Sequence, residues 1–277
     1  MKRACVLAPK RMNMRLRVGP PFANSTKRSK MTECHFEICI PDEARKLDQN
    51  EEWIEIVRDG EAEKIRLHDY GRFYEIPGLY DELYRRLQCT SPRVVCEALK
   101  SQVEKSGGNS RPLRALDFGA GNGQVGERLA GELGCEAVVG LDIIPQAKDA
   151  ARRDRPGVYE DYFVADLARP TDEEREALSR WRFDTLVTVA ALGYGDIGAE
   201  AFANAYDLVE DGGWVAFNIK DRFLSEKDET GFGEAIGSFV DDGFELVHSR
   251  RYRHRYSLGG EPLHYHVIVG RKHAGSF

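Results

Sequence analysis

The stretch LDFGAGNG at residues 116–123 decides the fold. It starts within a short apolar run, Leu113–Phe118, which predicts a buried strand. It then enters a turn with glycine at every second position, and glycine lets a backbone turn tightly and approach a ligand without Cβ clashes. A helical pattern over Gly123–Leu133 follows. The stretch therefore predicts a strand, a turn open to a ligand and a helix in succession.

The alternation of strand and helix continues after this first unit. Thr171 and Glu174 have the spacing of a capping box, which predicts the start of one of the helices. Strands separated by helices of this length imply right-handed crossovers and a parallel sheet buried on both faces. The further predicted strands are Glu136–Leu141, Val158–Val164, Phe183–Ala190 and Trp214–Ile219, and the further helices are 146–153, the one capped by Thr171, Ile197–Val209 and about 230–242.

The end of the chain breaks this rhythm. Phe244–Ser257 and Leu263–Gly270 both resemble strands, and only a short turn joins them. Strands connected so tightly must be antiparallel. We therefore predict an α/β fold over residues 111–277, a doubly wound and mostly parallel seven-stranded sheet that ends in an antiparallel C-terminal hairpin.

The segment over residues 31–110 predicts a smaller hairpin and helical cap. Weak alternation on both sides of Asp59-Gly60 predicts the hairpin. An aromatic-rich stretch follows, then a predicted helix over Leu79–Leu87. Ser91-Pro92 predicts another helix, with Ser91 as its N-cap and proline in its first position.

Charge is distributed unevenly along the chain. Residues 1–30 hold nine Lys or Arg and no Asp or Glu, although the whole chain has a net charge of −6. We predict a basic, disordered or non-native leader over residues 1–30. The rest of the chain is strongly acidic, which gives no electrostatic help to nucleic-acid binding. We therefore expect no DNA partner.

Membrane and metal sites are not indicated either. No apolar run approaches the roughly 20 residues that a membrane span needs, so we expect no membrane partner. Six scattered cysteines without a secretory signal are typical of reduced thiols in a cytoplasmic protein. Cys34-His35 and Cys39 have no second ligand pair at zinc-site spacing, so we predict no metal.

Ligands of open parallel sheets bind beyond the carboxyl ends of the strands. The glycine turn follows the first predicted strand, and Asp142 follows the second at about the spacing of an acid that hydrogen-bonds a ribose. Asp166-Leu167 follows the third, a carboxylate beside an apolar residue that suits an adenine edge and face. Small residues from Ala190 follow the fourth and leave space there. We predict a nucleotide-like ligand at this edge.

The segments LDFGAGNG, GLDI (140–143), ADL (165–167) and VEDGGWVAF (209–217) resemble the motifs of class I S-adenosylmethionine-dependent methyltransferases. The resemblance runs from about 113 to 271 and includes the reversed final strand. It implies a Rossmann-like fold, S-adenosyl-L-methionine as the cofactor and methyltransferase activity. Its implied contacts are to the methionine portion from Asp117, Gly119, Ala120, Gly121 and Gly123, to the ribose from Asp142, to the adenine from Ile143, Asp166 and Leu167, and near the sulfonium from Ala190.

A rival interpretation is a NAD(P)-dependent oxidoreductase, because Gly121, Gly123 and Gly126 also fit the dinucleotide pattern GxGxxG. Asp117 disfavours it, because an acid stands where dinucleotide sites usually stay apolar. Gly119 has no place in that register, and the closing antiparallel hairpin is unusual there. A non-catalytic S-adenosylmethionine-binding subunit is a further alternative.

The sequence says less about the methyl acceptor. Tyr194, Asp196 and Lys220 follow the fourth and fifth strands, so we predict them on the acceptor side as catalytic candidates. The cap offers Tyr70, Tyr74 and His68 as candidates for a lid or substrate contact. The segment from Ala191 lacks the Pro-Pro pattern of base-modifying amino methyltransferases, which disfavours nucleic-acid acceptors. We predict a small-molecule acceptor, with a protein acceptor as the alternative, and the oligomeric state stays open.

Overall fold

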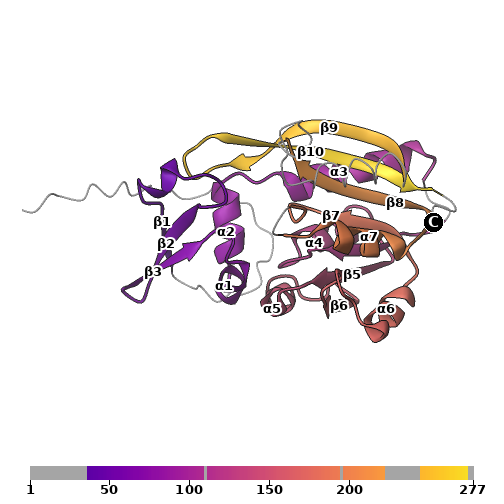
Figure 1. Cartoon of the computed structure of the whole chain (residues 1–277), viewed down its shortest axis with the longest axis horizontal. Coiled ribbons are helices and arrows are strands. Elements are labelled where there is room, and N and C mark those ends of the chain that lie inside the picture. The colour runs from indigo at the N-terminus through magenta and orange to yellow at the C-terminus, as the bar shows by residue number, and fades with distance from the viewer. Residues whose placement is uncertain (1–35, 109–110, 194–195, 222–243, 274–277) are drawn as a thin grey trace, which may run out of the picture. The chain divides into compact units, whose positions relative to one another are not determined.

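The central sheet carries the order β6-β5-β4-β7-β8-β10-β9 (Figure 1). The computed structural model describes residues 36–108, 111–193, 196–221 and 244–273, and within these ranges the sheet has seven strands. The predicted leader over residues 1–30 and the predicted helix over about 230–242 lie outside the described residues. The strands are β4 (Arg114–Phe118), β5 (Ala137–Asp142), β6 (Asp161–Val164), β7 (Phe183–Thr188), β8 (Val209–Lys220), β9 (Phe244–Tyr256) and β10 (Pro262–Lys272).

Strand directions confirm the predicted fold class. The pairs β4·β5, β4·β7, β5·β6 and β7·β8 are parallel. The last strand, β10, runs antiparallel to both β8 and β9, so it alone is reversed within this sheet of described residues. Because β4 lies in the middle and its neighbours continue outward on both sides, the strand order reverses next to β4, which is where ligands of open α/β sheets bind.

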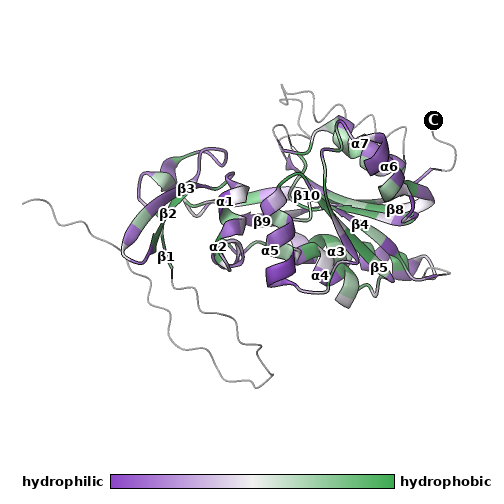
Figure 2. Ribbon diagram, turned by 90° about the horizontal axis from the view of Figure 1, so that it is seen from below, coloured by the Kyte–Doolittle hydropathy of each residue, from purple (hydrophilic) through white to green (hydrophobic). Residues whose placement is uncertain are grey.

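Helices cover both faces of this sheet (Figure 2). On one face, α3 and α4 pack their apolar side chains against β4, β5, β8 and β10. On the other face, α6 and α7 bury theirs against β4, β5, β7 and β8. The capping box predicted for α6 is present, with Thr171 and Glu174 bonded reciprocally. The helix bounds are α3 (Ser91–Lys105), α4 (Gln124–Gly131), α5 (Pro145–Asp154), α6 (Asp172–Ser179) and α7 (Ala199–Asp207).

Two local predictions were wrong. The strand predicted at Trp214–Ile219 begins earlier, at Val209, so residues 211–213 lie inside β8, which bulges so that Phe183 pairs with Val209 but Thr185 pairs with Trp214. Gly212 has a φ of 74° there, so the glycine serves a bulge within the strand. Ser91 is the first residue of α3 and not its N-cap, because its hydroxyl bonds side chains of β9 instead of the helix backbone.

The N-terminal cap (residues 36–87) contains a three-stranded antiparallel sheet and two helices. The hairpin predicted around Asp59-Gly60 is confirmed, and the short strand β1 extends it. Leu258, from the turn between β9 and β10, completes the apolar core of this cap. The elements are β1 (Glu37–Cys39), a 3₁₀ turn at Ala44–Lys46, β2 (Trp53–Arg58), β3 (Glu61–Arg66), α1 (Tyr70–Glu75) and α2 (Leu79–Arg86).

Hydrogen bonds join the far end of the β9–β10 hairpin to the cap. The backbone N–H of Tyr256 donates to the carbonyl of Leu87, and the N–H of Thr90 donates to the carbonyl of His254. A buried ion pair between Glu52 and Arg255, 2.7 Å apart, closes the same junction. The hairpin therefore brings residues near the C-terminus beside the cap.

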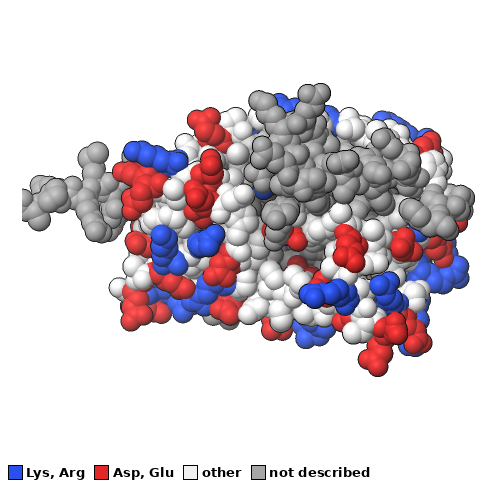
Figure 3. All heavy atoms as spheres, viewed as in Figure 1, with Lys and Arg blue, Asp and Glu red and all other residues white. Residues whose placement is uncertain are grey.

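The face shown in Figure 3 carries Lys and Arg side chains interspersed with Asp and Glu wherever the described residues are visible. In the described part of the chain, no helix combines the length and the apolar character that crossing a membrane requires.

Candidate functional site

The glycine turn after β4 adopts a left-handed backbone that favours glycine, and neighbouring side chains leave no room for a Cβ. Gly119 and Gly121 have φ values of 76° and 54°. A Cβ on Gly119 would lie 2.7 Å from the Cβ of Ala191, and one on Gly121 would lie 2.5 Å from the Tyr74 hydroxyl oxygen. The turn is therefore held against the segment after β7 on one side and against the cap on the other.

Substitution at this turn gives the first testable prediction. Gly121→Ala should lower the free energy of unfolding by roughly 1–3 kcal/mol, because the new methyl group meets the Tyr74 hydroxyl at an unfavourable φ. Urea unfolding measures this loss, and Tyr74→Phe in the same chain should restore part of it. Gly131→Ala is the matched control, because its Cβ would meet nothing within 4 Å. Equal stability of the two alanine variants would contradict the prediction.

Asp117 lies beneath the turn, and it lines neither cavity described below. Its side chain is buried, and Oδ2 accepts a 2.7 Å hydrogen bond from the Tyr159 hydroxyl. Oδ1 is buried without a hydrogen-bond partner among the described residues. Burial raises the pKa of Asp117 to about 7, against the opposing effect of the Tyr159 hydrogen bond. Its predicted contact with a methionine portion stays a prediction.

Asp142 ends β5 and borders the glycine turn. Its Oδ2 accepts from the Gly121 N–H at 2.9 Å, and its Oδ1 accepts from the Ile144 N–H at 3.0 Å. Burial raises the pKa of this carboxyl, whereas those backbone N–H groups lower it. The next residue, Ile143, is 61% exposed, an unusual position for a large aliphatic side chain beside a sheet edge.

The larger cavity lies at this sheet edge. Its volume is about 590 Å³, and the predicted residues Gly119, Asp142, Ile143, Asp166, Leu167 and Ala190 line it. Asp166 follows β6, and its Oδ1 accepts from the Ala168 N–H at 2.9 Å, which fixes the carboxylate at the cavity wall. Pockets of 300–1,000 Å³ are typical of small-molecule and cofactor sites.

A smaller cavity of about 70 Å³ adjoins it. Ala120 and Gly121 line this one, and a group of residues lines both cavities, so these residues mark the junction. The structure thus brings together all the described catalytic and lid candidates. The shared residues are His68, Tyr70, Tyr74, Tyr80, Gly119, Val189, Ala190, Asp196 and Lys220. Tyr194 lies outside the described residues.

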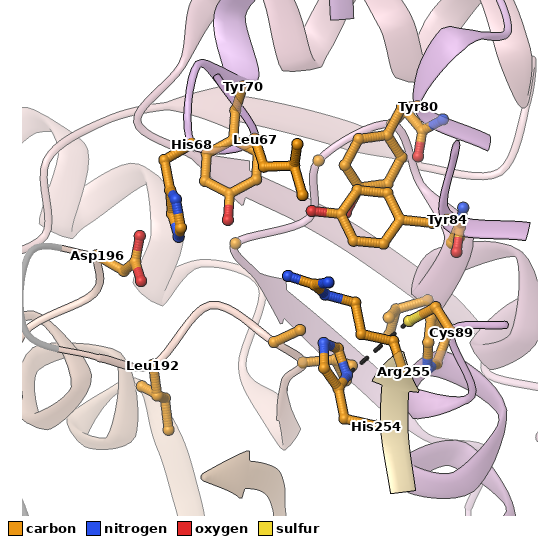
Figure 4. Close-up of a pocket in the computed structure, with 18 of the residues that line it drawn as sticks. Leu67, His68, Tyr70, Tyr80, Tyr84, Cys89, Leu192, Asp196, His254 and Arg255 are labelled. Atoms are coloured by element: carbon orange, nitrogen blue, oxygen red, sulfur yellow. Dashed lines mark hydrogen bonds between the residues drawn. The ribbon is translucent and has the colours of Figure 1, made fainter. Parts of the chain in front are cut away.

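Titratable groups at the junction are perturbed. Figure 4 shows the Asp196 carboxylate directed toward the His68 ring. Burial lowers the pKa of His68, while the nearby Asp196 charge opposes that change. Burial likewise raises the pKa of Asp196, against the charges of His68 and Lys220. An imidazole that is neutral near pH 7 can accept a proton, so the junction can support acid–base chemistry.

Ala190 follows β7 at the junction. Its φ of 56° is unusual for a residue with a Cβ, and its N–H donates to Oδ1 of Asn218 at 2.6 Å. Strained backbone held by a buried side chain is common at functional sites.

Sequence reasoning missed several residues of the smaller cavity. Arg and His residues alternate over 250–255 as in a strand, a pattern that favours a solvated outer face, but His254 and Arg255 are each 3% exposed. Local alternation could not show that this end of β9 packs against the cap. The other missed lining residues include Gln49, Tyr80, Tyr84, Cys89 and Tyr265.

Of the three residues considered as metal ligands, Cys34 and His35 lie outside the described residues. No group of three or more His, Cys, Asp or Glu side chains arranged to hold a metal gathers in the part that the structure describes.

Known proteins resemble the part of the chain that carries the glycine turn. The model of a family described as a methyltransferase domain matches residues 116–215. No curated protein matches the chain in sequence. Among solved structures, the N-methyltransferase NodS from Bradyrhizobium japonicum WM9, in complex with S-adenosyl-L-homocysteine, is similar at 17% identity and a TM-score of 0.45, over 62% of this chain and 85% of NodS.

Magnesium protoporphyrin IX methyltransferase (ChlM) from Synechocystis PCC 6803, with bound S-adenosylmethionine, is similar at 16% identity and a TM-score of 0.42, over 64% of this chain and 77% of ChlM. The family match covers the glycine turn, Asp142, Asp166 and Ala190, which are the residues that build the larger cavity. Residues 116–215 thus belong to a methyltransferase domain family, and the chain carries a methyltransferase domain.

Proposed function

We propose that this chain binds S-adenosyl-L-methionine in the larger cavity and transfers the methyl group to a small molecule that enters the smaller cavity. One observation carries the proposal. The glycine turn, Asp142 and Asp166 all border one cavity of suitable size, and that cavity meets a second one beside His68 and Asp196.

The residues present fit this cofactor. The close approaches at Gly119 and Gly121 leave a turn without side chains next to the cavity. Asp142 would bind the ribose hydroxyls, because a carboxylate oxygen can accept more than one hydrogen bond. The exposed Ile143 would pack on the adenine, with Asp166 at its amino group and Leu167 beside it. Gly119 would hold the methionine portion where the two cavities meet, with Ala120 and Gly121 beside it at the edge of the smaller cavity, and Ala190 would lie near the sulfonium. Gly123 lines neither cavity and packs against Tyr159, so its predicted contact stays a prediction.

The cofactor supplies a methyl group already activated by the sulfonium, so the protein has to orient the acceptor and exclude water. The junction residues His68 and Asp196 are placed to take a proton from an acceptor hydroxyl or amine. Lys220, at the end of β8, contributes positive charge there. Tyr70 and Tyr74 close the junction from α1 of the cap.

The size of the smaller cavity supports a small-molecule acceptor. A space of about 70 Å³, walled by the cap and the β9–β10 hairpin, suits part of a small molecule better than a peptide or nucleic-acid strand. The face shown in Figure 3 carries intermixed charge in its described part, which gives DNA no electrostatic preference for that face. A protein acceptor remains the alternative, together with a non-catalytic subunit that only binds the cofactor.

Calorimetric titration tests the cofactor proposal. The chain should bind S-adenosylmethionine and S-adenosylhomocysteine, and it should not bind NAD. Binding of NAD alone would overturn the proposal in favour of an oxidoreductase. Binding of S-adenosylmethionine without methyl transfer to any small molecule or protein would favour the non-catalytic subunit.

The Asp142→Ala variant tests the ribose contact. We expect weaker S-adenosylhomocysteine binding by roughly 1–3 kcal/mol, because the variant loses the hydrogen bonds of a charged acceptor. Calorimetry of both proteins measures the difference, and Asp149→Ala, an exposed acid on α5, is the matched control. Equal affinity of wild type and Asp142→Ala would show that Asp142 serves only the Gly121 turn.

A further inference from the structure

A buried chain of polar groups leads from the strained Ala190 backbone to the smaller cavity. Asn218 Oδ1 accepts from the Ala190 N–H at 2.6 Å, and its Nδ2 donates to the Tyr252 hydroxyl at 2.7 Å and to Ser91 Oγ at 3.2 Å. Ser91 Oγ lies 2.6 Å from both the Tyr252 hydroxyl and His254 Nδ1. The chain therefore ends on one nitrogen of the His254 ring.

Counting hydrogens fixes the direction of these bonds. The Ala190 N–H can only donate, so the Asn218 amide must present its oxygen there and its NH₂ group to Tyr252 and Ser91. The Tyr252 hydroxyl then has one acceptor among the described residues, Ser91 Oγ. Ser91 in turn must donate to Nδ1 of His254. Nδ1 is therefore unprotonated, and the hydrogen of the neutral ring lies on Nε2.

The neutral state of the ring agrees with its surroundings. Burial, with the charges of Arg255 and Lys220, lowers the pKa of His254 well below its usual range. Cys89 Sγ lies 3.9 Å from Nδ1, and its S–H can donate to the unprotonated Nδ1 of the same tautomer. No partner of Nε2 is recorded among the described residues, and the ring borders the smaller cavity (Figure 4). His254 thus presents one N–H donor to the cavity.

Aromatic rings line the same cavity as this donor. The His254 and Tyr265 rings lie 4.2 Å apart at 30°, and the Tyr80 and Tyr84 rings lie 4.4 Å apart at 34°. Ring faces of this kind favour a planar guest. Arg255 lines the same end, and its ion pair with Glu52 uses part of its donor set.

We propose that His254 Nε2–H binds a carbonyl or carboxylate oxygen of a planar methyl acceptor and thereby fixes its orientation toward the junction. The acceptor is then a small aromatic carbonyl or carboxylate compound, with its nucleophilic group beside His68 and Asp196. The identification of the bound compound as a methyl acceptor rests on the proposed function. The protonation state of His254 does not depend on it.

The tautomer is tested first, on the full chain labelled with ¹⁵N-histidine. Long-range ¹H–¹⁵N spectra distinguish a protonated from an unprotonated ring nitrogen, and loss of the signals in His254→Gln assigns them. We expect an unprotonated Nδ1, a protonated Nε2 and no titration between about pH 5.5 and 8. A hydrogen on Nδ1, or a ring that titrates in that interval, would overturn the proposal.

The oxygen contact is tested with benzoate, benzamide and benzylamine, added to the chain saturated with S-adenosylhomocysteine. Benzoate and benzamide should both shift the His254 Nε2–H signal. Tighter binding of benzoate would indicate a carboxylate site, and tighter binding of benzamide would indicate a site for a neutral carbonyl. Benzylamine offers no acceptor oxygen and should not shift it. No response to either oxygen compound, or a larger response to benzylamine, contradicts the proposal.

Two substitutions separate a binding role from a structural one. Glutamine places its amide nitrogen near the position of Nε2, whereas asparagine places its amide near Nδ1, next to Ser91. His254→Gln should keep the benzoate or benzamide affinity within about threefold, and His254→Asn should lose about tenfold or more. A purely structural role predicts the reverse order, because asparagine retains the Ser91 contact.

Two controls complete the test. His264→Gln on β10 should change nothing, and all three variants should keep their affinity for S-adenosylhomocysteine. If the chain fails to bind S-adenosylhomocysteine but the tautomer is as expected, the proposed function is wrong and the His254 assignment stands.

Discussion

Replacing Glu52 by alanine is expected to lower the free energy of unfolding by about 3–5 kcal/mol, because it leaves the Arg255 guanidinium buried without its counter-charge. The side chains of Glu52 and Arg255 are 0% and 3% exposed, and their closest oxygen and nitrogen atoms lie 2.7 Å apart. The second Glu52 oxygen accepts from the Leu258 N–H, which would also lose its partner. Equilibrium urea unfolding measures the difference between variant and wild type.

The control for this prediction is an ion pair of similar length on the surface. Arg93 and Glu97 lie 2.8 Å apart with both side chains 51% exposed, so Glu97→Ala should cost no more than about 1 kcal/mol. Glu52→Leu combined with Arg255→Met should recover much of the loss, because an apolar pair needs no counter-charge. If Glu52→Ala lost no more stability than Glu97→Ala, water would have to reach the Arg255 side chain where the β9–β10 hairpin meets the cap.

The central sheet and the edge that borders the larger cavity could be predicted from the sequence, whereas the contact between Glu52 and Arg255 could not. The parallel sheet was predictable because each buried strand is a short apolar run and each crossover helix has its own periodicity. The position of Asp142 and Asp166 at the larger cavity was predictable because the ends of parallel strands lie at the same edge of the sheet. The prediction of the sheet and that of the residues at the strand ends each depend on a local sequence pattern and on the rule that ligands bind at the carboxyl ends of parallel strands.

His254 and Arg255 were not predictable in this way. Consecutive strand residues point to opposite faces, so local alternation expects one of them to be exposed. Both are buried, because His254 packs against Ser91 and Tyr265, whereas Arg255 forms its ion pair with Glu52 of the cap. A contact between residues 203 positions apart leaves no periodic signal in the sequence. This end of the smaller cavity therefore required the structure, whereas the edge of the sheet that borders the larger cavity did not.

The second large effect is expected from Asp117, whose buried carboxyl should make the fold less stable as pH rises. Burial raises its pKa to about 7 in the folded chain, from an ordinary value of 3.8. The folded state therefore holds a proton that the unfolded state has lost between these two values. Because stability falls with pH wherever the folded state binds more protons, Asp117 should contribute a decrease in the free energy of unfolding of up to about 4 kcal/mol between about pH 4 and pH 7.

Asp117→Asn removes this titration. The variant should be more stable than wild type above pH 7, and the decrease with pH should be smaller by the Asp117 contribution. Thermal and urea unfolding from pH 4 to pH 8 measure both quantities. Asp211→Asn, at an exposed position, is the control and should leave the pH dependence unchanged. If the free energy of unfolding changed with pH in the same way in wild type and Asp117→Asn, the Asp117 carboxyl would have the same pKa in the folded and unfolded chain.

The same measurement decides what Asp117 does in the presence of cofactor. If Asp117 contacts the methionine ammonium, bound S-adenosylhomocysteine places a positive charge beside the carboxylate, lowers its pKa and abolishes the decrease in stability between pH 4 and pH 7. If Asp117 only supports the turn through Tyr159, the decrease persists at saturating ligand. Its burial outside both cavities favours the second result. In that case the acid that precedes the glycine turn shapes the turn from below, and the turn itself contacts the ligand.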